Sequence, residues 1–502
     1  MSKGGTKIEY CIPNEVVVVA NTLQNNNFEA YLIGGCTRDL ILGRKPKDWD
    51  ITTNAKPEQI QALFSDTFYE NDYGTVGIVN RETLDSTLQY VEVTPYRLES
   101  NYSDNRRPDS VTFSETLEED LKRRDFTINA IALKIDRETS VAGTYETSLI
   151  DLYGGIQDLK NSLLRAVGNP LDRFNEDALR IMRAVRLSAE LNFTIDNETE
   201  KGIIETSHLL SKIAKERIRE EFTKMIMSSA PMYGMQICQK YGLIPHILPE
   251  IGKAIGVAQN KSHIYDVWEH SIRALQHGAD KGFSLEVRLA ALLHDIAKPH
   301  TKRSEGQEAT FYGHEVLGAR LAEKSLTELR YSKKIIEKVT KLVRWHMFFA
   351  DTEQISHSAV RRIVAKVGQE NVWDLMKVRA CDRIGMGRPK EDPYRLRKYE
   401  AMIEEVMRDP ISVGMLKIDG KRLIDITKML PGPKIGYILH ALLEEVLDKP
   451  ELNTSEYLES QAIELSRLPE KKLREIGEEG KQKKEDEDEK VVKQIRKEHK
   501  VV

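Results

Sequence analysis

The stretch YLIGGCTRDLILGRKPKDWDIT, residues 31–52, decides the fold of the N-terminal part of this chain. Its apolar start, residues 31–33, predicts a buried strand. Gly34 and Gly35 then predict a tight turn at which backbone can approach a phosphate closely. Arg38 falls on the first turn of a predicted helix, where oriented N–H groups and a guanidinium suit a triphosphate.

Two acids flank one residue near the end of this stretch. On a strand, a period of two places Asp48 and Asp50 on one face. Adjacent carboxylates repel each other unless a cation lies between them, and Mg²⁺ prefers such oxygen ligands, with water and phosphate completing its shell. Alone, a Gly-Gly pair is usually a turn, and a D-x-D is usually a solvated strand end. Their occurrence together within this short stretch is much rarer, and it is this combination that predicts a nucleotide site.

The whole chain sets bounds on the class of protein. Its 502 residues, 40% hydrophobic and 31% charged, predict several domains rather than one. No apolar run approaches the ~18 residues of a membrane span, and the N-terminus has no signal-like apolar region, so we expect a cytoplasmic protein without a membrane anchor. Four scattered cysteines agree with a reducing compartment. A net charge of −4 argues against a uniformly basic surface, but it does not exclude a local basic patch that binds the phosphates of an RNA.

A third carboxylate is predicted downstream of the D-x-D. Alternation over residues 76–79 and 89–94 predicts paired strands joined by a polar turn, and Glu92 falls in the middle of the second strand. Glu92 is either an exposed residue of an edge strand or an acid that faces Asp48 and Asp50.

Two further segments combine arginine with aspartate. Arg123-Arg124-Asp125 is predicted at a helix start, either as a solvated ion pair or as a contact to triphosphate and ribose. Residues 174–186 are predicted as one helix, on which Asp177 and Arg180 share a face. This pair is either part of a surface salt-bridge ladder or a set of donors and acceptors matching the Watson–Crick edge of a base.

These motifs, with the strings VEVTPYR, RRDFTINA and ED-x-x-R, resemble the class II tRNA nucleotidyltransferases, the family of bacterial CCA-adding enzymes and poly(A) polymerases. The resemblance implies an α/β, polymerase beta-like nucleotidyltransferase domain followed by a long all-α region. It implies that CTP and ATP are added to the 3′ end of tRNA without a nucleic-acid template. The implied catalytic residues are Asp48, Asp50 and Glu92, of which Asp48 and Asp50 hold Mg²⁺. The implied nucleotide-binding residues are Gly34, Gly35, Arg38, Arg124, Asp177, Arg180, Arg183 and Arg186.

Several specificities stay open at this point. The segment SDNRRPDSVTF, residues 103–113, resembles the flexible loop that the family uses to switch from C to A addition, which argues against an enzyme that adds only C. A poly(A) polymerase or an A-adding or CC-adding enzyme remains an alternative, because the family's motifs overlap.

A second set of chemistry-bearing residues begins near residue 261. His270, His294-Asp295 and Asp382 fall on separate predicted helices, and a set of this kind fits a metal site in a helical bundle. The set resembles the HD phosphohydrolase superfamily. The resemblance implies Ni²⁺, Mn²⁺, Co²⁺ or Zn²⁺, and a phosphate ester such as a 2′,3′-cyclic phosphate at a damaged RNA end. His314 and His346 are predicted either to hold a second metal ion or to lie at the rim of the metal site. An alternative of another class is a pure HD hydrolase whose transferase half only binds nucleotide.

The predicted domain organisation follows from these assignments. We expect a catalytic domain at 1–160 and a nucleotide-selecting and RNA-binding helical domain at 161–255. An HD domain is expected at 256–390, a helical tRNA-binding region at 391–468, and a charged helical or disordered tail at 469–502. The turn before Lys434 either caps a helix or offers a phosphate site. No protein partner is predicted.

Overall fold

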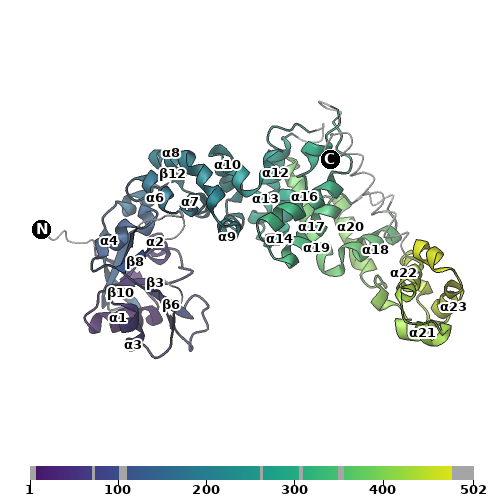
Figure 1. Cartoon of the computed structure of the whole chain (residues 1–502), viewed down its shortest axis with the longest axis horizontal. Coiled ribbons are helices and arrows are strands. Elements are labelled where there is room, and N and C mark those ends of the chain that lie inside the picture. The colour runs from purple at the N-terminus through teal and green to yellow at the C-terminus, as the bar shows by residue number, and fades with distance from the viewer. Residues whose placement is uncertain are drawn as a thin grey trace. The chain divides into compact units, whose positions relative to one another are not determined.

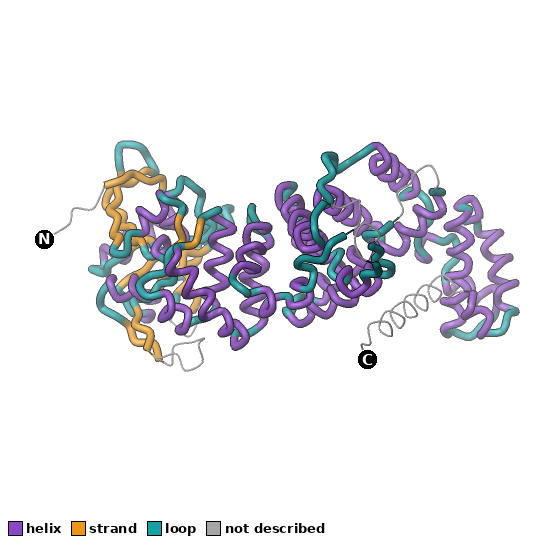
Figure 2. Tube along the Cα trace, turned by 90° about the horizontal axis from the view of Figure 1, so that it is seen from above, coloured by secondary structure: helices purple, strands orange, loops and turns teal. Residues whose placement is uncertain are grey.

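The computed structural model describes residues 7–69, 74–100, 110–259, 264–304, 309–348 and 355–476. The chain divides into two compact units, residues 1–247 and residues 248–502. Figure 2 colours strands orange, and they gather in the first unit. Each unit is described here by itself.

Unit 1 is organised around a mixed sheet that has eight strands within the described residues, in the order β1-β10-β9-β2-β3-β6-β5-β4. Its strands are β1 Lys7–Cys11, β2 Tyr31–Leu32, β3 Asp50–Thr53, β4 Thr67–Tyr69, β5 Val76–Val79, β6 Tyr90–Pro95, β9 Ile131–Glu138 and β10 Thr144–Asp151. Two small pairs complete the strands: β7 Arg97–Ser100 with β8 Ser110–Phe113, and β11 Leu163–Leu164 with β12 Thr194–Ile195. The α/β class predicted for the N-terminal part is confirmed.

The predicted pairing of residues 76–79 with 89–94 is confirmed, since β5 and β6 are antiparallel neighbours. Strand β3 lies parallel to β6, in a register that sets Asp50 opposite Glu92. The prediction that the strand includes Asp48 is wrong, because β3 begins at Asp50. Its partner β2 ends just before Gly34, where a φ of 76° turns the chain away, so no ladder partner remains on that side for the residues before Asp50.

The helices of unit 1 pack against this sheet and against one another (Figure 1). They are α1 Asn14–Asn25, α2 Gly35–Ile41, α3 Pro57–Leu63, α4 Leu117–Lys122, α5 Gly155–Lys160, α6 Pro170–Glu176, α7 Leu179–Leu191, α8 Asn197–Thr206, α9 Lys215–Ile226, α10 Pro231–Lys240 and α11 Ile244–Ile247. Leu117 and Leu121 of α4 pack in one buried cluster with Ile33, Tyr96 and Ala132, which fixes α4 over the central strands.

Two further local predictions are wrong. Residues 174–186 do not form one helix: α6 ends at Glu176, and Asp177 is extended, with φ −138° and ψ 103°. The Asp177 carboxylate accepts the N–H of Leu179 at 3.0 Å, so it caps α7, a position that short acidic side chains favour over a helix interior. Arg123-Arg124-Asp125 follows α4 instead of opening a helix, and the apolar residues beyond it form β9.

Unit 2 is largely helical (Figures 1 and 2). Its helices are α12 Pro249–Gly252, α13 Val267–Asp280, α14 Leu285–Leu293, α15 Lys298–Thr301, α16 His314–Glu328, α17 Lys333–Trp345, α18 His357–Val367, α19 Gln369–Gly385, α20 Tyr394–Val406, α21 Gly420–Thr427, α22 Pro433–Asp448 and α23 Ser455–Ser466. Helices α13, α14, α17 and α19 pack around a common core, and α21 to α23 form a separate group. Across the described ranges, no helix is long and apolar enough to cross a membrane.

Candidate functional site

The Gly34-Gly35 turn gathers the charged residues predicted in unit 1. A Cβ atom placed on Gly34 would lie 3.5 Å from Asp50 Oδ2 and 3.6 Å from Arg124 Nη1. One placed on Gly35 would lie 3.5 Å from Asp48 Oδ1 and 3.7 Å from Arg38 Nη2. Both glycines therefore face a space bordered by carboxylates on one side and guanidinium groups on the other, and a side chain at either position would enter it.

The carboxylates at this turn offer oxygen ligands alone. Asp48 is exposed, whereas Asp50 and Glu92 are half-buried and lie opposite each other on β3 and β6. Such a set fits Mg²⁺, which takes oxygen ligands and keeps positions for water and phosphate. In the part of the chain that the structure describes, these three acids do not form a closed group with ligand atoms within 4.8 Å of one another.

The two guanidinium groups are held in place by acids and an amide. Arg38 Nη1 donates to Asn129 Oδ1 at 3.0 Å, and its Nε donates to Asp39 at 2.9 Å. Arg124 Nη2 donates to the buried Asp120 at 2.9 Å, while Arg124 Nε is buried without a hydrogen-bond acceptor. Burial opposes ionisation of Asp120, but the guanidinium groups of Arg124 and Arg123 outweigh it and lower its pKa to about 2. These contacts fix the orientation of both guanidinium groups at the turn.

A hydrogen-bonded chain connects this turn to α7. Asn129 Nδ2 donates to Asp125 Oδ1 at 3.4 Å, and Asp125 Oδ2 accepts from Arg183 Nε at 2.7 Å. Burial raises the pKa of Asp125, but Arg183 and Arg180 reverse the shift and lower it to about 2. Sequence analysis missed Asp120 and Asn129, although Asn129 lies within the string RRDFTINA and Asp120 lies three residues before it.

Of the residues predicted to select the base, Asp177 lies in the break between α6 and α7, and Arg180 lies in the first turn of α7. Asp177 pairs with Arg217 of α9 at 2.8 Å. Arg180 pairs with Glu176 at 2.8 Å and donates to the Arg123 carbonyl at 3.0 Å. The two side chains are thus fixed by separate partners. Arg186 is ion-paired with Glu190 and Glu221 and only 11% exposed, so its contacts in this structure are internal.

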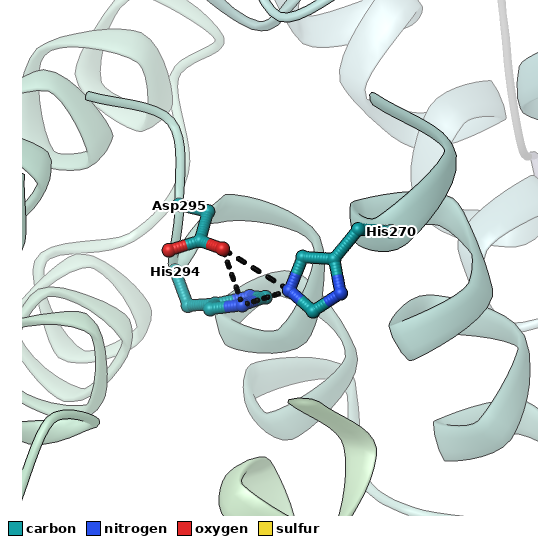
Figure 3. Close-up of side chains that lie close together, drawn as sticks. All are labelled: His270, His294 and Asp295. Carbon is teal, nitrogen blue, oxygen red and sulfur yellow. Dashed lines mark hydrogen bonds and ion pairs between the residues drawn. The ribbon is translucent and has the colours of Figure 1, made fainter. Parts of the chain in front are cut away.

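A cluster of histidines and aspartates forms the core of unit 2. His270 lies within α13, His294 and Asp295 follow α14 directly, and Asp382 lies on α19. The Nε2 atoms of His270 and His294 are 2.8 Å apart and lie 3.0 and 3.1 Å from Asp295 Oδ2, as Figure 3 shows. Asp382 Oδ1 lies 3.3 Å from His270 Nε2. The structure brings all four predicted residues together.

The Asp295 carboxylate also faces a second group. Its Oδ1 lies 3.3 Å from His314 Nε2 and 3.8 Å from His346 Nε2, so each oxygen meets one pair of imidazoles. His294, His314 and His346 each direct Nδ1 at the carbonyl three residues earlier, at 2.7 or 2.8 Å. This contact fixes Nδ1 as the protonated nitrogen and leaves Nε2 as a ligand atom, as in metal-binding histidines.

The charges in the cluster agree with a cation. Burial alone would keep His294 neutral, but Asp295 and Asp382 outweigh it and raise its pKa to about 10. Burial, and then His294 and His314, hold the pKa of His346 well below its usual value. Two buried carboxylates thus lie among imidazole nitrogens, a donor set that favours transition metals over Mg²⁺.

A cavity of about 580 Å³ opens onto this cluster. Asp295, His314, His346 and Asp382 line it, together with the cations Lys298 and Arg379. Lys298 Nζ lies 2.6 Å from Asp295 Oδ2, and Arg379 pairs with Asp382. Sequence analysis missed both cations, although each is three residues away from a predicted aspartate along the chain. Two cations next to this histidine–aspartate cluster could bind the oxygens of a phosphate group.

The other predicted features are Lys434, the flexible loop and the charged tail. Lys434 donates to the Ser466 carbonyl at 3.0 Å, so it joins α22 to the end of α23 in this structure. Of the predicted flexible loop, residues 110–113 form β8, and residues 103–109 lie outside the described residues, as do residues 477–502 of the tail.

Three family models match successive parts of the chain. The poly A polymerase head domain matches residues 30–165, and the probable RNA and SrmB-binding site of polymerase A matches residues 192–255. The HD domain matches residues 267–387.

Curated relatives and solved structures agree with these matches. A CCA-adding enzyme of Lactobacillus helveticus is 31% identical over 88% of this chain and 94% of its own length. One of Limosilactobacillus reuteri is 47% identical, but the match covers 43% of this chain and half of that relative. The Bacillus stearothermophilus CCA-adding enzyme in complex with CTP is 26% identical over 91% of this chain and 98% of its own, with a TM-score of 0.64. The Thermotoga maritima CCA-adding enzyme complexed with tRNA shares the fold at 19% identity and a TM-score of 0.54.

Proposed function

The chain belongs to the family of CCA-adding enzymes, and we propose that it adds C, C and A to the 3′ end of tRNA from CTP and ATP without a nucleic-acid template. The proposed reaction is attack by the tRNA 3′ hydroxyl on the α-phosphate of the nucleotide, with release of pyrophosphate. An enzyme with these substrates would work in the cytoplasm. The observation that carries the proposal is the convergence of Asp48, Asp50, Arg38 and Arg124 on the Gly34-Gly35 turn.

Each group at the turn has a role that follows from its position. The glycines leave room for the triphosphate, and Arg38 and Arg124, held by Asn129 and Asp120, bind its oxygens. Asp48, Asp50 and Glu92 would hold Mg²⁺, which supplies charge stabilisation on the attacking and leaving oxygens. The buried Arg124 Nε is a donor that a phosphate oxygen would satisfy.

Base choice is proposed for Asp177 and Arg180. Both side chains are anchored, Asp177 by Arg217 of α9 and Arg180 by the Arg123 carbonyl. An anchored carboxylate and guanidinium present acceptors and donors in a fixed pattern, as a Watson–Crick partner does. Arg183, 36% exposed, is proposed to reach the nucleotide, and Arg186 to support α7 through Glu221.

Sequencing of reaction products tests this proposal directly. A tRNA transcript that lacks the terminal CCA is incubated with the protein, Mg²⁺ and all four nucleotides, and its 3′ ends are then sequenced. We expect the addition of CCA followed by termination. A run of A residues on tRNA and on unrelated RNA alike would instead identify a poly(A) polymerase.

A second function is proposed for unit 2, on the evidence of the prebuilt histidine–aspartate cluster and its cavity. We propose a metal-dependent phosphohydrolase with Ni²⁺, Mn²⁺, Co²⁺ or Zn²⁺ held by His270, His294, Asp295 and Asp382. Bound metal would supply a nucleophilic water and polarise the phosphate. Lys298 and Arg379 would bind the phosphate oxygens of an ester such as a 2′,3′-cyclic phosphate at an RNA end.

A metal screen tests the second proposal. Purified protein is supplied with each of the four metals, and hydrolysis of 2′,3′-cyclic nucleotides and phosphate monoesters is measured. We expect turnover with at least one metal. Absence of hydrolysis with every metal and both substrate classes would leave the cluster as a structural element.

A further inference from the structure

An aromatic pair lies on the sheet of unit 1 next to the catalytic carboxylates. Phe68 of β4 is 39% exposed and Tyr90 of β6 is 45% exposed, and their rings meet edge to face with centroids 5.9 Å apart. Large exposed aromatics in contact with each other mark interaction surfaces more often than chance. We call Phe68 and Tyr90 the aromatic platform.

The strand register places the platform on the same face as the carboxylates. Asp50 pairs with Glu92, Glu92 with Gly77 and Gly77 with Phe68, so one cross-strand row runs from β3 to β4. Paired residues project from the same face of a sheet, and Tyr90 shares that face because it lies two residues from Glu92. At about 4.8 Å between strands, Phe68 lies about 10 Å from Glu92.

Gly77 keeps this face open for the Phe68 ring. A Cβ atom on Gly77 would overlap the ring, so Phe68 lies flat across β5 only because that position has no side chain. The ring therefore extends toward Tyr90 and the carboxylates instead of standing away at the sheet edge.

The groups proposed to bind the nucleotide lie on the other side of the carboxylates. Arg38 is on α2, which contacts β9, and Arg124 lies between α4 and β9. In the sheet order, β9 and β2 precede β3 and β6, whereas β5 and β4 follow them. The row thus has phosphate-binding groups at one end, acids in the middle and aromatics at the other end.

Phosphoryl transfer requires that the attacking and leaving oxygens lie roughly in line across the phosphorus. With the leaving pyrophosphate on the β9 side, the attacking 3′ hydroxyl must arrive from the β5 and β4 side. Single-stranded nucleic acid binds by stacking its bases on exposed aromatic rings, whatever the base. We propose that the aromatic platform is the subsite for the single-stranded 3′ end of the acceptor RNA, and that a base of its last two nucleotides stacks there. This inference rests on the proposed transferase function.

Steady-state kinetics of two variants with a matched control test the subsite. Phe68→Leu and Tyr90→Leu keep apolar volume but remove the ring face, and each is expected to raise the KM for the RNA acceptor about 5- to 100-fold, as loss of one base–aromatic stack does, with the KM for CTP unchanged. Phe68→Tyr should restore the wild-type value. Tyr69→Leu is the control, because Tyr69 is 50% exposed but pairs with Val76 and so projects from the opposite face.

An acceptor without a base supplies an independent measurement. An abasic residue at the last or the penultimate nucleotide should weaken acceptor binding to the wild type by a similar factor, and Phe68→Leu should add little to that loss. Unchanged acceptor KM in a folded Phe68→Leu enzyme, or a raised KM for CTP instead, would overturn the subsite while leaving the transferase function in place. A wild type that extends no acceptor would overturn the transferase function and the subsite together.

Discussion

The two candidate metal sites of this chain differ in how exposed their acidic side chains are and in how closely their ligand atoms are grouped. In unit 1, Asp48 is exposed and Asp50 and Glu92 are half-buried on a sheet, and these acids form no closed group. In unit 2, His270, His294 and Asp295 are at most 2% exposed, and their ligand atoms lie within 4.8 Å of one another. Under the proposed functions, nucleotide phosphates would add ligands at the open site, whereas the closed site already offers three protein ligand atoms that lie close together.

This difference indicates where specificity lies in each half. An open carboxylate site exchanges its metal with each substrate and depends on nearby arginines to position phosphates. A closed imidazole site selects its metal through its ligand types and can retain it between turnovers. We therefore expect the sites to be independent in metal, residues and reaction, and the following changes test that independence from the largest effect to the smallest.

The largest effect is expected from the open site. Asp50→Asn and Asp48→Asn should each lower nucleotide incorporation by about 10³-fold or more, because loss of a metal ligand removes several kcal/mol of charge stabilisation. Filter binding should show that tRNA affinity survives. Asp85→Asn, which removes a loop carboxylate paired with Lys45, is the matched control. Near-normal incorporation by both active-site variants would exclude this site.

A reciprocal result is expected at the closed site. His294→Ala combined with Asp295→Ala should abolish phosphate-ester hydrolysis and lower the bound transition metal, measured by elemental analysis, while CCA addition remains within about twofold. The matched control is His277→Gln, because His277 is a buried histidine of α13, the helix that also carries His270, and it pairs with Glu391 instead of the cluster. Loss of CCA addition in a folded double variant would show that the two sites are coupled.

A smaller effect is expected on base choice. Arg180→Ala should reduce the discrimination between CTP and ATP by about 5- to 150-fold, since an unmatched polar group costs ~1–3 kcal/mol. The rate with the preferred nucleotide should fall less than the discrimination does. Competition assays with both nucleotides measure the ratio. If selectivity stays constant, Arg180 serves only its ion pair with Glu176.

The smallest effect concerns stability and pH. The pKa of Asp120 falls to about 2 in the folded chain against ~3.9 when unfolded, so its ionisation stabilises the fold above pH ~4, and this stability is lost as pH falls toward 2. Asp120→Asn should therefore cost about 2 kcal/mol at pH 7 and nearly nothing below pH 2. Urea denaturation of the full chain at several pH values measures it. A cost independent of pH would mean that Asp120 acts by packing.

The sequence was most informative where function constrains short segments. The Gly34-Gly35 turn with Asp48 and Asp50, and the adjacent His294 and Asp295, are such short segments, and the structure places each of them in a candidate site. It was least informative where partners come from distant segments. Asn129 reaches Arg38 across 91 residues, and Arg217 reaches Asp177 across 40, and no periodicity encodes such pairs.

Two of the three incorrect local predictions involve an aspartate side chain. Arg, Glu, Leu and Met favour helix throughout residues 174–186, but the Asp177 side chain caps the backbone and ends α6 there. Arg123-Arg124-Asp125 carries a helix-like charge pattern, yet Asp125 bonds Arg183 and the chain enters β9. In both places a hydrogen bond accepted by an aspartate side chain, local at Asp177 and long-range at Asp125, overrides local propensity.

The most direct test of the account uses three tRNAs, ending before the CCA, after one C and after both, with CTP and ATP supplied separately. If one site selects bases through protein side chains, the first two tRNAs should accept C from CTP, and the third should accept A from ATP and reject CTP. Incorporation of A from ATP into all three tRNAs with equal efficiency, or incorporation of C into the third, would contradict template-free CCA synthesis by this chain.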